Sequence, residues 1–324
     1  MCTAITFPAP DFYFGRTLDY ERSFGEEVTI TPRSFPLPFR EKDTLKHHYA
    51  IIGMASVQDG YPLYYDAVNE KGLAIAGLNF VGYADYKPSV PGKDNIAHFE
   101  LIPWLLGQCA SVTEARNLLS RVNITDTPFS ETVPPARLHW IIADRQQAIT
   151  LESVKDGIRI YDNPGGVLTN NPPFDEQMFQ LNNYMHLSPE PPRNRFSGKL
   201  PLQPYSRGMG ALGLPGDLSS QSRFVRAAFT KLNALSGTSE AENVGQFFHI
   251  LDTVSQTKGC CHLGGGEYEA TIYTACCNAS KGIYYYTTYE NRRITAVDMR
   301  RELLDGSDLS RHRLIREEDF RMQN

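Results

Sequence analysis

The residue with the clearest capacity for chemistry is Cys2, which directly follows Met1. A small residue at position 2 favours removal of the initiator methionine, so we expect the mature protein to begin with Cys2. That residue would carry a thiol and a free α-amino group, whose reference pKa values are about 8.5 and about 8. The amine can then accept the proton of the thiol, so that one residue supplies nucleophile and base. Free cysteines are also common as inert core residues, so position alone leaves a structural cysteine equally open.

An N-terminal thiol needs a neighbouring cation and an acceptor for its amine, and the segment Gly15–Asp19 contains both. Arg16 would stabilise a thiolate, and Asp19 would accept a hydrogen bond from the amine. Positions three apart point to opposite faces of a flat strand, so both side chains serve one site only where the strand bends, bulges or ends. The alternative is an ordinary surface ion pair.

Asparagine side chains could supply neutral donors for an oxyanion. Asn79 closes an apolar strand segment, and Asn170 stands beside Asn171 and two prolines. Turn formation before proline is the alternative role. Arg223 lies near the start of a predicted helix, where the helix dipole disfavours a cation. That misfit hints at a functional role, although a salt bridge is the simpler explanation.

Elements that could position these residues follow from periodicity and capping patterns. Strands are predicted at 2–7, 12–19, 49–57, 63–69, 73–79, 137–143, 148–154, 158–161, 270–277, 283–289 and 294–299. Capping boxes begin the predicted helices 112–122 and 240–254, and a third helix is predicted at about 222–235. The strands come in runs rather than alternating with helices. This order predicts an α+β protein with mostly antiparallel sheets covered by helices.

Composition excludes several classes of function. The 324 residues carry a net charge of −5 with 41% hydrophobic and 21% charged residues, as in ordinary globular proteins. No basic stripe favours a nucleic-acid partner. No apolar run approaches the roughly 20 residues that span a bilayer, and no secretory signal is visible. We therefore expect a cytoplasmic protein whose cysteines are mostly reduced.

Two other features remain open at this stage. The adjacent pairs Cys260–Cys261 and Cys276–Cys277 would suit a non-enzymatic redox or metal-binding module. They lack the ligand spacing of zinc sites, so we expect no metal and no cofactor. The proline- and glycine-rich stretch 186–216 is long for a loop inside a compact domain. It is therefore predicted to be an active-site lid or an arm that packs against another subunit.

The ordered set of motifs resembles the choloylglycine hydrolase family of N-terminal-nucleophile hydrolases, and in particular its bacterial conjugated bile salt hydrolases. The resemblance rests on Met-Cys-Thr at the start and on 15–19, 69–73, 76–80, 138–140, 167–172, 213–217, 222–224 and 282–291. It implies a four-layer αββα fold in one domain over 1–324. It also implies a homotetramer in which residues 186–216 form an assembly arm.

The same resemblance implies roles for individual residues. Cys2 matches the nucleophile, Arg16 and Asp19 match its polar supports, Asn79 and Asn170 match the oxyanion and positioning asparagines, and Arg223 matches a second arginine. The implied reaction is hydrolysis of the amide between a bile acid and glycine or taurine, through a thioester on Cys2. Penicillin V acylases share these motifs and are the alternative.

A steroid substrate requires a broad apolar pocket. Segments rich in aromatic and aliphatic residues near the predicted site could form its wall. The candidate wall residues are Leu18, Tyr20, Tyr61, Tyr65, Phe129 and Val133.

Overall fold

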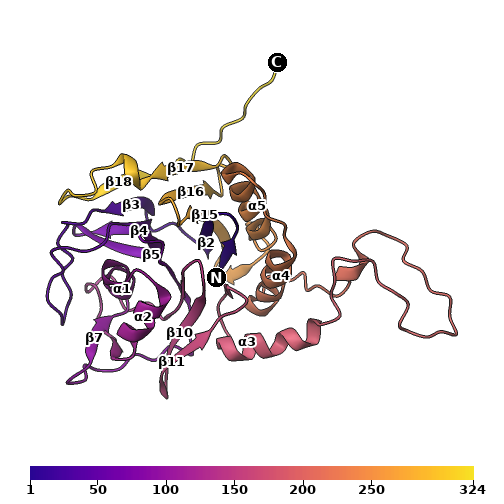
Figure 1. The fold of residues 1–324 in the computed structure, drawn as a ribbon, viewed down its shortest axis with the longest axis horizontal. Coiled ribbons are helices and arrows are strands. Elements are labelled where there is room, and N and C mark those ends of the chain that lie inside the picture. The colour runs from indigo at the N-terminus through magenta and orange to yellow at the C-terminus, as the bar shows by residue number, and fades with distance from the viewer.

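Two antiparallel sheets pack face to face, and helices cover their outer faces, in the computed structural model of residues 1–324 (Figure 1). The first sheet has six strands, in the order β12 (Val167–Leu168), β1 (Cys2–Pro8), β2 (Phe12–Tyr20), β15 (Ala270–Asn278), β16 (Ile283–Thr288) and β17 (Thr295–Asp298). Its outer face is covered by α4 (Ser220–Asn233) and α5 (Glu240–Asp252).

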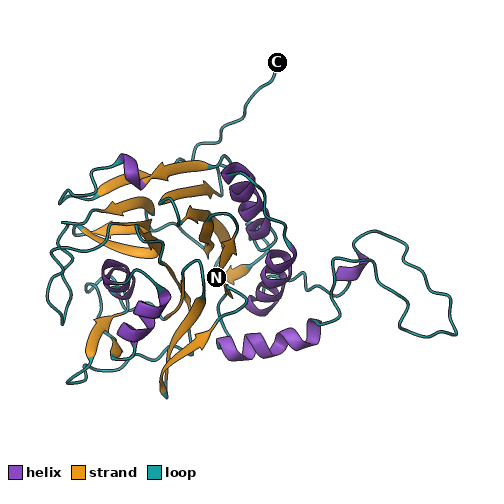
Figure 2. Ribbon diagram, in the orientation of Figure 1, coloured by secondary structure: helices purple, strands orange, loops and turns teal.

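The second sheet has eight strands, in the order β11 (Gly157–Asp162), β10 (Ala148–Val154), β9 (Leu138–Ala143), β6 (Ala74–Asn79), β5 (Tyr61–Asn69), β4 (Ile51–Gln58), β3 (Glu27–Thr31) and β18 (Ser310–Arg313). Helix α1 (Leu101–Gln108) packs on its outer face, and α2 (Val112–Leu119) follows in the same layer (Figure 2). The layers therefore run helix, sheet, sheet, helix, which confirms the predicted α+β sandwich.

The smaller elements lie around this sandwich. They are the parallel pair β7 (Asp94–Ala97) and β8 (Val122–Thr125), the hairpin β13 (His262–Gly264) and β14 (Glu267–Tyr268), helix α3 (Phe174–Gln180), and the short 3-10 helices Leu181–Tyr184, Met209–Ala211 and Met299–Arg301. No helix combines the length and the apolar character needed to cross a membrane.

Two hydrophobic cores hold the layers together. The larger contains 39 buried residues around the first sheet, on the side of α4 and α5 and between the sheets. The smaller contains 25 buried residues between the second sheet and α1 and α2. Since neighbouring residues of a strand point to opposite faces, the central strands are buried on both sides. This explains why β1 and β6 read as nearly continuous apolar segments.

Three sequence expectations differ from the structure. The helix predicted at 112–122 ends at Leu119, because Ser120 and Arg121 turn the chain and Val122 begins β8. Helix α1 was not expected: seven of its eight residues are buried, so it has no polar face to give a helical period. No strand was predicted after residue 299, but the mostly exposed arginine-rich segment 292–316 contributes the edge strand β18.

The stretch 186–216 contains only one short 3-10 helix and extends away from the sandwich (Figure 1). Several large apolar side chains along it are exposed: Phe196, Leu200, Leu202, Tyr205 and Leu212. The C-terminal residues also leave the body as an extended tail (Figure 1).

Candidate active site

Cys2 is the first residue of β1 and is almost fully buried, with 2% of its surface exposed. Strand β1 pairs with β2 so that Cys2 faces Leu18 and Ala4 faces Arg16. Paired residues of antiparallel strands project to the same face, so Cys2, Leu18 and Arg16 share one face of the sheet. Arg16 contacts the second sheet, which identifies this face as the one between the sheets.

Asn170, just beyond β12, holds the backbone nitrogen of Cys2. Its Oδ1 accepts a hydrogen bond from that nitrogen at 2.8 Å, and its Nδ2 donates to the carbonyl oxygen of Asn79 at 2.8 Å. Asn79 closes β6, so this amide links the first sheet to the second. Removal of Met1 would convert the nitrogen of Cys2 into the α-amino group, still within reach of Asn170.

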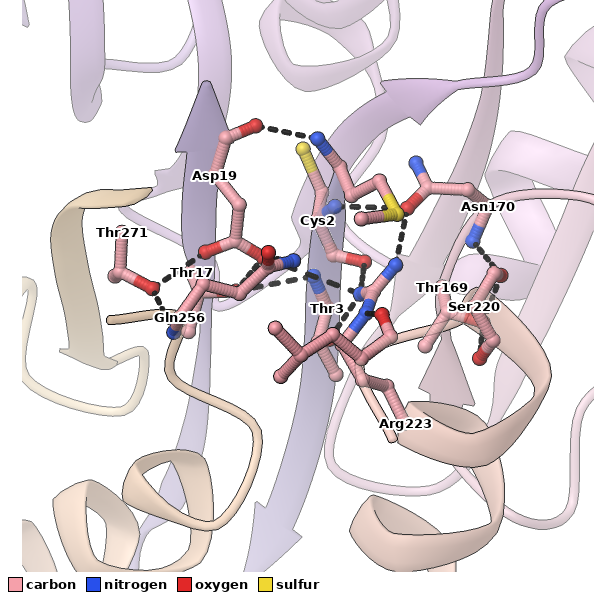
Figure 3. Close-up of polar contacts among 12 residues, drawn as sticks. Cys2, Thr3, Thr17, Asp19, Thr169, Asn170, Ser220, Arg223, Gln256 and Thr271 are labelled. Carbon is pink, nitrogen blue, oxygen red and sulfur yellow. Dashed lines mark hydrogen bonds and ion pairs between the residues drawn. The ribbon is translucent and has the colours of Figure 1, made fainter. Parts of the chain in front are cut away.

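Arg223 reaches Cys2 from the first turn of α4 and is fully buried (Figure 3). Its Nη1 donates to the carbonyl oxygen of Cys2 at 2.5 Å and to Oγ1 of Thr3 at 2.7 Å, and its Nη2 donates to Oδ1 of Asn170 at 2.8 Å. Burial lowers the pKa of this guanidinium, against the opposing effects of Asp19 and Cys2. Arg223, whose charge is unfavourable at a helix N-terminus, is therefore the residue that binds the backbone carbonyl of Cys2.

Asp19 lies on the opposite face of β2 from Arg16, toward the helices. Its carboxylate accepts hydrogen bonds from Thr17 at 3.1 Å and from Thr271 at 2.7 Å, and it lies 3.9 Å from Nη1 of Arg223 (Figure 3). A bulge in β15 opposite Leu18 and Asp19 brings Thr271 into this position. Arg16 and Asp19 thus lie on different faces of β2. The carboxylate of Asp19 is linked to Cys2 through Arg223, and the Cys2 nitrogen donates to Asn170 rather than to Asp19.

Arg16 is buried between the sheets, with 1% of its surface exposed. It donates hydrogen bonds to the carbonyl oxygens of Thr17 at 3.1 Å, Tyr65 at 3.2 Å and Gly77 at 2.5 Å, and its Nη2 has no partner. Burial works against its charge, but the acidic groups of Cys2, Tyr273 and Asp66 nearby raise the pKa of Arg16. A permanently charged group whose Nη2 has no partner therefore lies on the same face of the sheet as the thiol.

The six candidate wall residues do not form one group. Leu18 and Tyr65 lie in or against the core between the sheets, and Tyr20 follows on the same strand and face as Leu18. Tyr61 instead packs with Phe99 and Phe129 in the core on the far side of the second sheet. Val133 is half-buried in the loop before β9. The structure therefore brings Leu18, Tyr20 and Tyr65 toward Cys2 and separates Tyr61 and Phe129 from it.

Glu269 is a buried acid beside the site that the sequence reading missed. Its carboxylate forms an ion pair with the amino group of Met1, and its exposed fraction is only 3%. Burial lowers the pKa of the Met1 amine. A glutamate immediately before an apolar strand was the only available signal, and such residues are usually solvated. Glu269 therefore binds the amino group of the residue directly before Cys2.

The other cysteines do not share one site. Cys276 and Cys277 are buried on β15, where burial raises the pKa of both thiols. Cys260 is exposed and Cys261 half-buried beside Glu269. No group of three His, Cys, Asp or Glu side chains is close enough to hold a metal ion.

The profile of the linear amide C–N hydrolases, choloylglycine hydrolase family, matches residues 2–312. The chain belongs to the choloylglycine hydrolase family. A bile salt hydrolase/transferase of Lactiplantibacillus plantarum is 58% identical over 320 residues, which cover 99% of both chains. Another of Clostridium perfringens is 38% identical over 97% of both chains. This family membership makes the protein a hydrolase of linear amide bonds.

Solved structures agree with the architecture described above. A conjugated bile acid hydrolase from Clostridium perfringens superposes over 100% of both chains with a TM-score of 0.93 and 36% identity. A penicillin V acylase from Agrobacterium tumefaciens matches 96% of this chain and 90% of its own with a TM-score of 0.74 and 20% identity. The second likeness shows the shared N-terminal-nucleophile hydrolase fold alone.

Proposed function

We propose that this protein hydrolyses the amide bond of glycine- or taurine-conjugated bile salts, with Cys2 as the nucleophile after removal of Met1. The observation that carries the proposal is the arrangement around the buried Cys2 at the start of β1. Asn170 and Arg223 bind its backbone, Asp19 lies 3.9 Å from Arg223, and Arg16 lies on the same face of the sheet as the thiol. The names of the relatives from Lactiplantibacillus plantarum and Clostridium perfringens support the substrate.

In the proposed mechanism, the α-amino group of Cys2 takes the thiol proton and the thiolate attacks the amide carbon. Arg16 stabilises the thiolate through its free Nη2. Asn79 supplies a donor for the oxyanion, and loss of one such donor typically costs about 2.7–4 kcal/mol. Asn170 positions the amine, because both atoms of its amide are already engaged.

Collapse of the intermediate breaks the C–N bond, and the α-ammonium of Cys2 returns its proton to the leaving amine. The bile acid then remains as a thioester on Cys2. Water attacks this thioester, which releases the free acid and regenerates the thiol. An amino acid could replace water and give a new conjugate, an activity that the transferase names of the relatives support.

The decisive experiment is to incubate the purified protein with glycocholate, taurocholate and penicillin V, and to measure release of glycine, taurine or 6-aminopenicillanic acid. We expect release from the bile salts, and none from a Cys2→Ala variant. Cleavage of penicillin V alone would favour the acylase alternative. Undiminished turnover by Cys2→Ala would refute the nucleophile. Absence of turnover in the parent protein would favour the non-enzymatic thiol module based on Cys260, Cys261, Cys276 and Cys277.

We further propose that the chain is one domain over 1–324 and forms a homotetramer in the cytoplasm. The exposed apolar side chains of the stretch 186–216 support an assembly arm, because an isolated subunit would leave them in water. No metal or organic cofactor takes part in the proposed reaction.

A further inference from the structure

His139 and Glu152 form a buried pair on the second sheet that the chemistry above does not use. Both side chains are fully buried. Their neighbours Trp140 and Leu151 pair across β9 and β10 and face the core beside α1. His139 and Glu152 therefore point to the other face, toward the first sheet.

Each side chain of the pair holds one side of the segment that contains Asn170. Nδ1 of His139 lies 3.1 Å from Oε1 of Glu152, and Nε2 lies 2.9 Å from the carbonyl oxygen of Thr169. The same Oε1 accepts a hydrogen bond from the backbone nitrogen of Phe174 at 3.0 Å. The pair thus binds the chain one residue before Asn170 and four residues after it.

Both nitrogens of His139 face oxygen acceptors. Which ring nitrogen donates depends on the tautomer, but both lie within hydrogen-bond distance of an oxygen atom. Phe80 stacks on the ring, with centroids 4.3 Å apart and 6° between the planes, which fixes its orientation. The ring is therefore held by its face and by both edges.

Asn170 has little freedom once this segment is fixed. Its backbone nitrogen donates to Oγ of Ser220 at 2.8 Å, and its carbonyl oxygen accepts from Nε2 of Gln177 at 2.6 Å. The side chain must then meet the nitrogen of Cys2 at one defined point.

We propose that His139 and Glu152 are positioning residues for the reaction of Cys2, acting through Asn170. This inference rests on the proposed nucleophile but not on the identity of the bile salt. A misplacement of about 1 Å in a catalytic group can lower the rate about 100-fold. Loss of the pair is therefore expected to affect turnover more than substrate binding.

The test compares Glu152→Ala with Glu152→Gln. In Glu152→Gln the amide oxygen can take the place of Oε1, so it still accepts from the backbone nitrogen of Phe174 and from Nδ1–H of His139. We expect Glu152→Ala to lose about 10- to 100-fold in kcat with KM changed less than about threefold. Glu152→Gln should recover most of the lost kcat. The rate at which iodoacetamide alkylates Cys2 should fall in Glu152→Ala and recover in parallel.

Trp140→Phe is the matched control, because it alters a buried side chain next to His139 on the opposite face of β9. It should lower the melting temperature and leave kcat and the alkylation rate unchanged. The proposal is overturned if folded Glu152→Ala retains the parent kcat, if Glu152→Gln is as impaired as Glu152→Ala, or if Trp140→Phe loses as much turnover. If Glu152→Ala does not fold, the same comparison uses His139→Gln. If turnover by the parent enzyme proves not to depend on Cys2, that result would instead count against the proposed nucleophile.

Discussion

Replacing Arg223 by lysine separates the charge of this residue from its geometry. Arginine donates here to four oxygens, which belong to Leu218, Cys2, Thr3 and Asn170. Lysine keeps the charge opposite Asp19 but has one nitrogen on a flexible stem, so it cannot bind the cysteine carbonyl and the asparagine amide with the same fork.

The size of the effect follows from these contacts. A hydrogen bond that involves a charged group contributes about 1.5–3 kcal/mol. If one of the two contacts to Cys2 and Asn170 is lost from the transition state, each 1.36 kcal/mol lowers the rate tenfold. We therefore expect kcat for glycocholate to fall about 10- to 100-fold in Arg223→Lys, measured by the release of glycine at saturating substrate.

Arg226→Lys is the matched control on the same helix. Arg226 is also buried, and it donates to the carbonyl oxygens of Thr253, Pro215 and Asp217, away from Cys2. This variant should lose stability in thermal unfolding but keep its kcat. Parent-like turnover by Arg223→Lys, or an equal loss of turnover by Arg226→Lys, would refute the assignment of Arg223 to the cysteine.

Three further predictions concern maturation, pH and assembly. Protein that retains Met1 should be inactive, because the nitrogen of Cys2 is then an amide and the Met1 amine is bound by Glu269; intact mass and turnover measured on the same preparation check this. Burial lowers the pKa of His98 to about 4, and its Nε2 accepts a hydrogen bond from Ala136, so only the neutral ring fits the fold. The unfolded chain binds this proton near pH 6.5, so stability should fall by up to about 3 kcal/mol as the pH drops from 6.5 to 4. Denaturant unfolding of His98→Gln should show a smaller loss, and an equal loss would contradict the assignment. A Phe196→Asp and Tyr205→Asp double variant should sediment as a smaller species if the exposed arm mediates assembly, whereas an unchanged sedimentation coefficient would exclude that role.

Much of the fold could be predicted from local patterns. Residues 2–7 were predicted as a strand and form β1, although both faces of this strand are buried. The capping patterns at Ser111 and Ser239 predicted α2 and α5, because each marks a helix start whose backbone N–H groups are satisfied. Helix α1 escaped prediction because it is buried on nearly all sides and contains Pro103 in its first turn. A segment without a polar face gives no period from which to infer its structure.

The residues of the site could be predicted from the sequence more readily than the contacts that they make. Cys2, Asp19 and Arg223 could be named from residue type and motif, and the structure brings them together. No local pattern could show that Tyr61 belongs to the other core, since the face to which a strand residue points depends on the bulge between Met54 and Ala55 and on pairing between distant strands. Phe129 lies in the loop between β8 and β9, whose packing against Tyr61 has no periodic signal. The pairing of His139 with Glu152 likewise depends on strand register.

The supports of Cys2 are also the contacts that join the layers. Arg16 bonds the first sheet to the second, Asn170 bonds to the end of β6, and Arg223 ties α4 to β1. The reactive sulfur therefore acquires its surroundings only when the whole sandwich has closed. The protein should therefore lose activity only when it unfolds as a whole. In a denaturant titration, turnover and secondary structure should disappear in the same transition, and no folded but inactive state should precede it.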